Sequence, residues 1–195
     1  MTLHTIPQVF YTDDPSVVAQ KLLGALLVRE FRNETLIGRI VETEAYLADG
    51  DEASHGFKGL NSRNASMFKE AGHAYVHQMR QWNLLDVVVQ GAGVPAGVLI
   101  RAVEPVQGVA TMSRLRGPGV QRGLANGPGK LCQAFAINRE LDGISVTDPS
   151  SPLRLAFSEE TSATHRIQSS GRIGITKAKD ELLRFFIVGN PHVSR

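Results

Sequence analysis

The sequence contains a single cysteine, Cys132, among its 195 residues. One cysteine excludes an internal disulfide framework and a cysteine-based zinc cluster, and it predicts a reducing, intracellular setting. The first 14 residues hold neither a charged leader nor a continuous apolar segment, so we expect no export. No stretch approaches the roughly 20 apolar residues that cross a membrane, so we expect no membrane partner.

Acidic side chains are missing between Glu104 and Glu140, although the whole chain has a net charge of only +2. A local positive excess suits the backbone of a nucleic acid, and the glycines of this segment allow close approach. A solvated basic surface without a ligand is the competing interpretation. The basic residues here are Arg114, Arg116, Arg122, Lys130 and Arg139.

Strand-like runs follow one another closely, at residues 25–31, 36–47, 73–79, 84–90 and 96–105. Short turn-prone segments separate the first two runs and the next two, which predicts two hairpins. Neighbouring strands with few helices between them predict an α+β fold. We expect a single domain over residues 1–195, with a central, mostly antiparallel β-sheet flanked by short helices, and a protruding β-hairpin.

Three short helices are predicted around these strands. Asp13 or Asp14 is suited to cap a helix that begins at Pro15 and ends at Gly24. Further helices are predicted at residues 106–115, after a strand that Pro105 stops, and at residues 129–137. The connection at residues 47–72 is predicted to hold one helical turn near residues 63–68, and connections this long inside a compact domain are usually functional.

The segment VETEAYLADGDEASH, residues 41–55, holds five carboxylates and no lysine or arginine. On a regular strand Glu42, Glu44 and Tyr46 share one face, and the residues between them form a core face. Glutamate is unfavourable in strands, so the presence of Glu42 and Glu44 two positions apart on one strand requires a specific explanation.

Three interpretations of these carboxylates remain open on the pattern alone. Both glutamates could lie on an exposed face and pair with Arg39 or Arg101. The acidic residues and His55 could bind a metal ion, although their spacing matches no compact metal-binding motif. One glutamate could instead be a catalytic base beside Tyr46, an aromatic platform for a flat substrate.

Five segments resemble, in order and at near-family spacing, the landmarks of the alkyladenine (3-methyladenine) DNA glycosylases. They are RIVETEAYLADGDEASH, NSRNASMF, GHAYVH, VLIRAVEP and GPGKLCQAFAI, and the opening LLGALLVRE and closing FFIVGNPHVS are similar to that family too. A single piece such as GPGK is weak evidence, whereas five in order over nearly the whole chain are specific.

The resemblance implies an enzyme that flips an alkylated purine, such as 3-methyladenine or 7-methylguanine, out of duplex DNA and hydrolyses its N-glycosidic bond to leave an abasic site. Glu44 falls on the family's water-activating base. Tyr46 and His55 fall on two walls of the base pocket, and Arg101 on an arginine at the strand end. No metal or other cofactor is implied, because an N-alkylated purine is already a cationic leaving group.

The other carboxylates of the segment receive no catalytic role. Glu42 is interpreted as a structural partner of an arginine, and Asp49, Asp51 and Glu52 as residues that keep the loop soluble. No lysine falls on a position suited to Schiff-base chemistry, so we expect hydrolysis without strand nicking.

The second hairpin departs from the family pattern. His77 stands where a stacking tyrosine is expected, and the intercalating tyrosine has no identical counterpart. Met79 is the predicted wedge between base steps, because methionine adapts its shape, with Gln78 and Arg80 as the other candidates. Alternatively, Met79 is a core or tip residue and Arg80 touches phosphate.

Asp86 is the second departure, since the family has an asparagine at this position on the pocket floor. A carboxylate only accepts hydrogen bonds. We therefore expect Asp86 to tolerate guanine adducts and to favour cationic bases over neutral ones such as hypoxanthine. An ion pair between Asp86 and Arg101, without a part in selection, is the alternative.

Double-stranded DNA with a damaged purine is the partner that the resemblance implies, and a monomer is the simplest expectation. Two other functions remain open: a catalytically weak nucleic-acid-binding protein of the same fold, which the lost tyrosines favour, and a metal-dependent hydrolase. Besides the hairpin tip, the residues predicted to contact DNA are Arg63, Arg116, Arg122 and Lys130.

Overall fold

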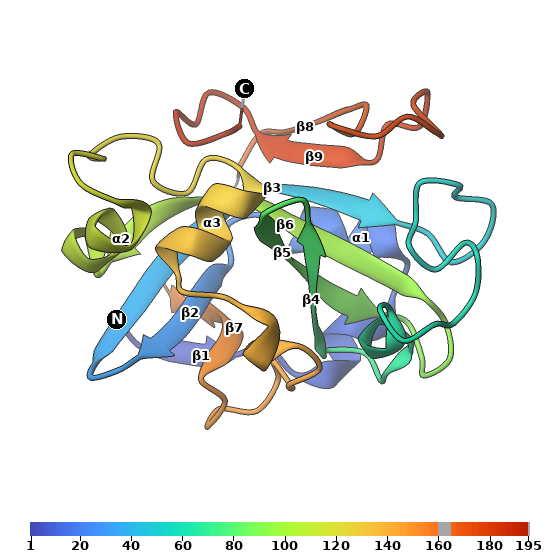
Figure 1. Cartoon of the computed structure of the whole chain (residues 1–195), viewed down its shortest axis with the longest axis horizontal. Coiled ribbons are helices and arrows are strands. Elements are labelled where there is room, and N and C mark those ends of the chain that lie inside the picture. Colours follow the sequence, from blue (N-terminus) through green and yellow to red (C-terminus); the bar gives the residue numbers. More distant parts are fainter. Residues whose placement is uncertain (160–164, 195) are drawn as a thin grey trace.

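An antiparallel sheet runs through the residues that the structure describes, 1–159 and 165–194 of the computed structural model (Figure 1). Its strands are β1 (Leu3–Thr5), β2 (Leu26–Phe31), β3 (Glu34–Tyr46), β4 (Ala74–Met79), β5 (Trp82–Val89), β6 (Ala96–Gln107), β7 (Leu153–Ser158), β8 (Ile167–Ser170) and β9 (Arg184–Ile187). The main path has the order β1-β7-β2-β3-β6-β5-β4, while β9 pairs with β3 and β8. All these pairs are antiparallel, so the predicted sheet type is confirmed.

Both predicted hairpins are present. Arg32 and Asn33 join β2 to β3, and residues 80–81 join β4 to β5. The first residue of each turn has a positive φ, 55° at Arg32 and 54° at Arg80. The β4–β5 hairpin forms one end of the main path, and its exposed tip carries Met79.

Short helices cover the sheet, which confirms the α+β class. Figure 1 shows α1 behind the strands and α3 in front of them. Asp14 caps α1 by accepting a hydrogen bond from the backbone N–H of Ser16, and Pro15 occupies the first helical position, as predicted. The helices are α1 (Pro15–Lys21), α2 (Val109–Arg116) and α3 (Pro128–Ala134), with short 3₁₀ segments at η1 (Gln8–Thr12), η2 (Ala65–Phe68) and η3 (Arg139–Leu141).

Three predicted helix boundaries are wrong. α1 ends at Lys21, three residues before the predicted end at Gly24. β6 continues through Pro105 to Gln107, so α2 begins three residues later than expected. Pro105 is tolerated because it pairs with Gly38 beside a register shift, where a missing N–H disturbs the ladder least. α3 ends at Ala134 because Ala136 has a φ of 49°, a left-handed conformation that closes a helix.

β3 is not a regular strand. Its register against β6 shifts on both sides of Glu42, so the simple alternation of faces fails there. Glu42 and Glu44 are both fully buried, with 0% of their surface exposed. The interpretation of an exposed acidic face is therefore wrong.

The connection between β3 and β4 is long and mostly without regular structure, as predicted, and η2 is its only described helical turn. The amide of Asn64 donates to the carbonyl oxygens of His55 and Gly59, which fixes the loop around His55. Cys132 is buried in α3. None of the helices among the described residues has the length and apolar character needed to cross a membrane.

Candidate active site

A row of side chains crosses four neighbouring strands on one face of the sheet. Glu44 on β3 pairs with Leu99 on β6, which in turn pairs with Asp86 on β5. Asp86 pairs with Tyr75 on β4. Directly paired residues of antiparallel strands project on the same side. The sheet therefore brings the carboxyl group of Glu44, from the β2–β3 hairpin, into one row with the carboxyl group of Asp86 and the phenol of Tyr75, both from the β4–β5 hairpin.

A small cavity of about 60 Å³ lies over this row and adjoins a larger groove of about 840 Å³. The cavity volume corresponds to about two water molecules at roughly 30 Å³ each, so a purine enters only if lining side chains move. Among the predicted site residues, the cavity is lined by Tyr46, His55, His77, Met79 and Asp86. The groove is lined by Arg63, Gln78 and Arg80, together with His55 and His77.

Glu44 is fully buried and lines neither the cavity nor the groove, but it is bonded to Tyr46, which lines the cavity. Its Oε1 accepts a 2.7 Å hydrogen bond from the backbone N–H of Ile173. Its Oε2 accepts one of 3.0 Å from the hydroxyl of Tyr46 and lies 3.2 Å from Nη1 of Arg101. Tyr46 thus stands between the carboxylate and the cavity.

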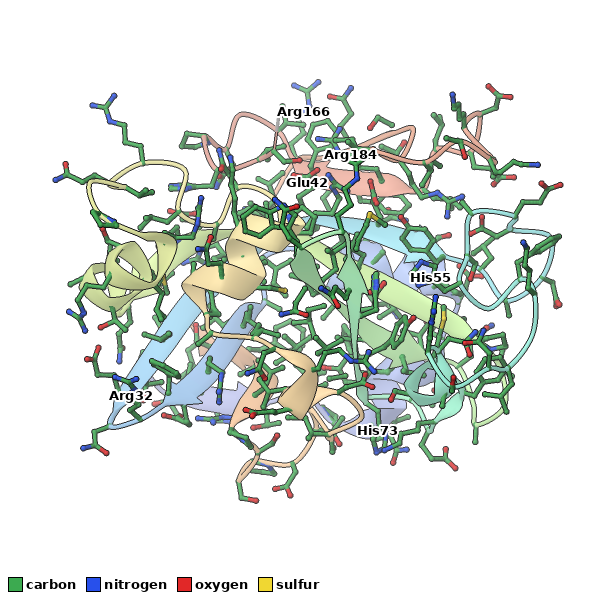
Figure 2. All side chains as sticks on the ribbon, in the orientation of Figure 1. Arg32, Glu42, His55, His73, Arg166 and Arg184 are labelled. Carbon is green, nitrogen blue, oxygen red and sulfur yellow. The ribbon has the colours of Figure 1, made fainter. Side chains whose placement is uncertain are left out.

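Glu42 is structural, as predicted, and one of its predicted partners is correct. Its Oε1 lies 3.1 Å from Nε of Arg101 and 2.6 Å from Nε of Arg184. Ser194 donates to both of its oxygens. Figure 2 shows Glu42 and Arg184 next to each other, with His55 in a separate part of the molecule. Arg101 therefore bridges the two buried glutamates and holds Glu44 in place.

The interpretation of Asp51 as a solubilising loop residue is wrong. Asp51 is buried and forms a two-pronged ion pair with Arg172, at 2.6 and 2.7 Å. The guanidinium of Arg172 lies 4.6 Å from the ring centre of Tyr46. Asp49 and Glu52 are exposed, in agreement with the prediction, although Glu52 also pairs with Lys177.

His55 belongs to an aromatic cluster at the junction of cavity and groove. Its Nδ1 shares a 3.0 Å hydrogen bond with the hydroxyl of Tyr75. Partial burial lowers the pKa of the imidazole, which favours its neutral form at pH 7. The ring of Tyr75 stacks on His77 with centroids 5.0 Å apart, and burial raises the pKa of that phenol.

His77 and Asp86 both line the cavity, with Nε2 and Oδ2 3.4 Å apart. Burial, with His55 and Arg139 nearby, lowers the pKa of His77 to about 3. Burial and the negative charge of Glu44 raise the pKa of Asp86 to about 8. These shifts favour the neutral form of both side chains, and a protonated Asp86 is a hydrogen-bond donor as well as an acceptor. Arg101 pairs with the glutamates, so the alternative Asp86–Arg101 ion pair is wrong.

The predicted DNA-contacting residues fall in two groups. Arg63 and Arg80 are exposed beside the groove, whereas Arg116, Arg122 and Lys130 lie near α2 and α3 and line neither cavity nor groove. Arg116 donates to Gln133 and to two backbone carbonyls, so it also supports the fold.

Sequence reasoning missed Tyr75, Arg139 and Arg172. Tyr75 could have been found, because it is two residues from His77 and so on the same face of a strand. Arg139 lines the groove, but its place in a basic segment was its only signal. Nothing in the sequence around Arg172, which stands alone between a glycine and an isoleucine, indicated a functional role. Across residues 1–159 and 165–194, no three His, Cys, Asp or Glu side chains gather as metal ligands would.

Comparison with known proteins decides the family. The model of the family described as "Methylpurine-DNA glycosylase (MPG)" matches residues 9–191. The chain belongs to the methylpurine-DNA glycosylase family. Relatives named "Putative 3-methyladenine DNA glycosylase" include proteins from a bacterium and an archaeon, Mesorhizobium japonicum and Methanoculleus marisnigri. The one from Mesorhizobium japonicum is 45% identical over 183 residues, 93% of this chain and 86% of its own. The one from Methanoculleus marisnigri is 43% identical over 192 residues, 98% and 99% of the two chains.

Membership of this glycosylase family confirms the resemblance found in the sequence, and the match covers nearly the whole sheet with the cavity and the groove. DNA is thereby the expected type of substrate.

Proposed function

We propose that this family member flips alkylated purines such as 3-methyladenine and 7-methylguanine out of duplex DNA and hydrolyses the N-glycosidic bond, with Glu44 as the base that activates water. The observation that carries the proposal is the fixed carboxylate of Glu44, 3.0 Å from the hydroxyl of a tyrosine that lines an aromatic cavity. Cleavage leaves an electron-poor sugar, so water attack needs a positioned carboxylate and little else.

The three bonds of Glu44 leave one acceptor position of its carboxylate for a water molecule. A carboxylate has about four acceptor positions, and Ile173, Tyr46 and Arg101 use three of them. A water on the remaining position would give its proton to the carboxylate as it attacks the sugar carbon. A negative charge about 4 Å from the developing positive charge contributes about 4 kcal/mol at an effective dielectric of about 20.

Entry of the base requires the cavity to open. Tyr46 and residue Ile175, from the β8–β9 connection, are among the lining side chains that must yield. When the ring of Tyr46 turns to stack on the base, its hydroxyl leaves Glu44 and uncovers the carboxylate for water. Product release would reverse these movements.

A catalytically weak DNA-binding protein of the same fold is the second candidate, and the complete burial of Glu44 favours it. The two functions are separated by incubating the protein with duplexes that carry 3-methyladenine, 7-methylguanine, ethenoadenine or hypoxanthine. Alkali-labile abasic sites are expected if the protein is a glycosylase. Tight binding to all four duplexes without any abasic product would support the binding protein instead.

The exposed arginines of the groove are expected to hold the DNA backbone. Arg63→Gln and Arg80→Gln should each weaken binding to damaged and undamaged duplexes alike, and each should lower the slope of log affinity against log salt by about 0.9. Arg32→Gln is the control, because Arg32 is exposed on the β2–β3 turn far from His55 (Figure 2). Equal slopes for Arg63→Gln, Arg80→Gln and the wild type would place the DNA elsewhere.

Met79 is proposed as the wedge that fills the gap left by the flipped nucleotide. It is 47% exposed at the hairpin tip and also lines the cavity. Met79→Ala should slow excision of a paired lesion about tenfold, because roughly half of the side chain's apolar contact is lost. The defect should shrink when the lesion is unpaired, since flipping then costs less. A larger defect in Gln78→Ala or Arg80→Ala would assign the wedge to that residue.

A further inference from the structure

His77 and Asp86 carry polar atoms that the folded chain leaves without a partner. Seven buried side-chain nitrogen and oxygen atoms in the described part of the chain have no hydrogen bond, and three of them belong to this pair. They are Nδ1 and Nε2 of His77 and Oδ2 of Asp86. Buried polar atoms nearly always have partners, so three unpaired atoms in one place call for a ligand.

Both residues that carry these atoms belong to the wall of the cavity. Only 8% of His77 and 5% of Asp86 is exposed, and both residues line the cavity. Nε2 and Oδ2 lie 3.4 Å apart, but their alignment does not make a hydrogen bond. The imidazole stacks within 9° of parallel on Tyr75, and the edge of His55 packs against it at 4.5 Å. These contacts fix the plane of the imidazole.

The surroundings of the pair favour a single acidic proton, carried by the carboxyl group of Asp86. Burial and Glu44 raise the pKa of Asp86, while burial, His55 and Arg139 lower that of His77. These directions favour a protonated carboxyl beside a neutral imidazole. The titratable or charged groups around the two residues are Glu44 and Tyr46 from β3, Tyr75 from β4, His55 from the loop, Cys132 from α3 and Arg139 from η3.

We propose that His77 and Asp86 act as one recognition pair, which reads the polar edge of a purine in the cavity and adapts to a neutral or a cationic base through a single proton. The proposal rests on the proposed function only in that a purine enters the cavity. It differs from the expectation that Asp86 acts as a fixed acceptor.

The two classes of base require different proton positions. Toward a neutral purine the carboxyl keeps its proton and donates it to a ring nitrogen, while its other oxygen accepts from an exocyclic amine. A cationic purine favours the ionised carboxylate. The O–H bond of Asp86 then breaks, the proton passes to bulk water, and no other bond changes. Binding of a cationic base is therefore coupled to proton release.

Titration calorimetry in phosphate and in Tris, whose ionisation enthalpies differ, measures this release. The probes are 7,9-dimethyladeninium, a fixed cation, and the neutral 9-methyladenine, each with the full-length protein at pH 7. The wild type should release close to one proton per cation bound and none with the neutral base. Asp86→Asn should release none with either base, because an amide does not titrate. His77→Phe keeps a flat ring on Tyr75 and should bind both bases about fivefold to tenfold more weakly.

The outcomes separate this proposal from the glycosylase function, because free bases require neither DNA nor Glu44 chemistry. Equal proton release with both bases, release that persists in Asp86→Asn, or no binding of either base at millimolar concentration would overturn the recognition pair. If the protein excises lesions but shows one of these results, the glycosylase function stands and the recognition pair is rejected. If proton release depends on Asp86 but the protein excises no lesion, the recognition pair stands and the glycosylase function is rejected.

Discussion

Glu44→Gln is expected to slow base excision about a thousandfold, because about 4 kcal/mol of charge stabilisation is lost from the transition state. The amide also cannot take a proton from the attacking water. Single-turnover excision from a duplex with one lesion measures the effect, with the abasic product revealed by alkali. Affinity for the same duplex should stay within about twofold, since Glu44 carries no contact to the DNA backbone in this proposal.

The fold should survive this change. Glutamine can still accept from the N–H of Ile173, and Arg101 keeps its bond to Glu42. Glu42→Gln is the matched contrast, because it alters an equally buried carboxylate that holds Arg101, Arg184 and Ser194. It should lower the melting temperature more than Glu44→Gln. An excision rate in Glu44→Gln equal to that of the wild type would remove Glu44 from the mechanism.

Local signals in the sequence were sufficient for the hairpins and for much of the cavity. Tyr46, His77 and Asp86 stand in apolar runs that the sequence identifies as strands, so the strand that carries each residue can be deduced from position alone. The turns at residues 32–33 and 80–81 separate such runs clearly. The proline at position 105 predicted the end of the strand, but β6 continues through it because Pro105 pairs with Gly38 on β3. A proline in the sequence gives no information about such a partner on another strand.

Burial and partner choice were beyond the reach of the sequence. Asp51 and Glu52 are adjacent acidic residues in one loop, and the pattern treats them alike. One is buried against an arginine 121 positions away, whereas the other stays exposed. The burial of Glu44 also depends on a distant segment, since Ile173 reaches it from the β8–β9 connection. Only the three-dimensional packing distinguishes these carboxylates.

The Asp51–Arg172 pair is expected to have a large effect on stability. Asp51→Asn leaves the guanidinium of Arg172 buried without its counter-charge, and removal of one partner from a buried pair costs about 3 to 5 kcal/mol of unfolding free energy. In a chain of this length, that loss lowers the melting temperature by roughly 6 to 20 °C. Glu52→Gln is the control, because it breaks the exposed pair with Lys177 between the same two segments and should barely change the melting temperature.

The pH dependence of this difference tests its cause. Burial alone would raise the pKa of Asp51, but the hydrogen bonds and charge of Arg172, with backbone N–H groups of Leu47 and Ala53, lower it. A carboxyl whose folded pKa is depressed contributes stability above its unfolded pKa, about 3.9, and loses it as the pH falls through the folded value. Wild type and Asp51→Asn should therefore differ by a constant amount from pH 7 to about 5 and converge below about 4. A difference that persists undiminished at pH 2, or no difference at pH 7, would mean that the ion pair does not hold the β8–β9 connection against the strand of Glu44.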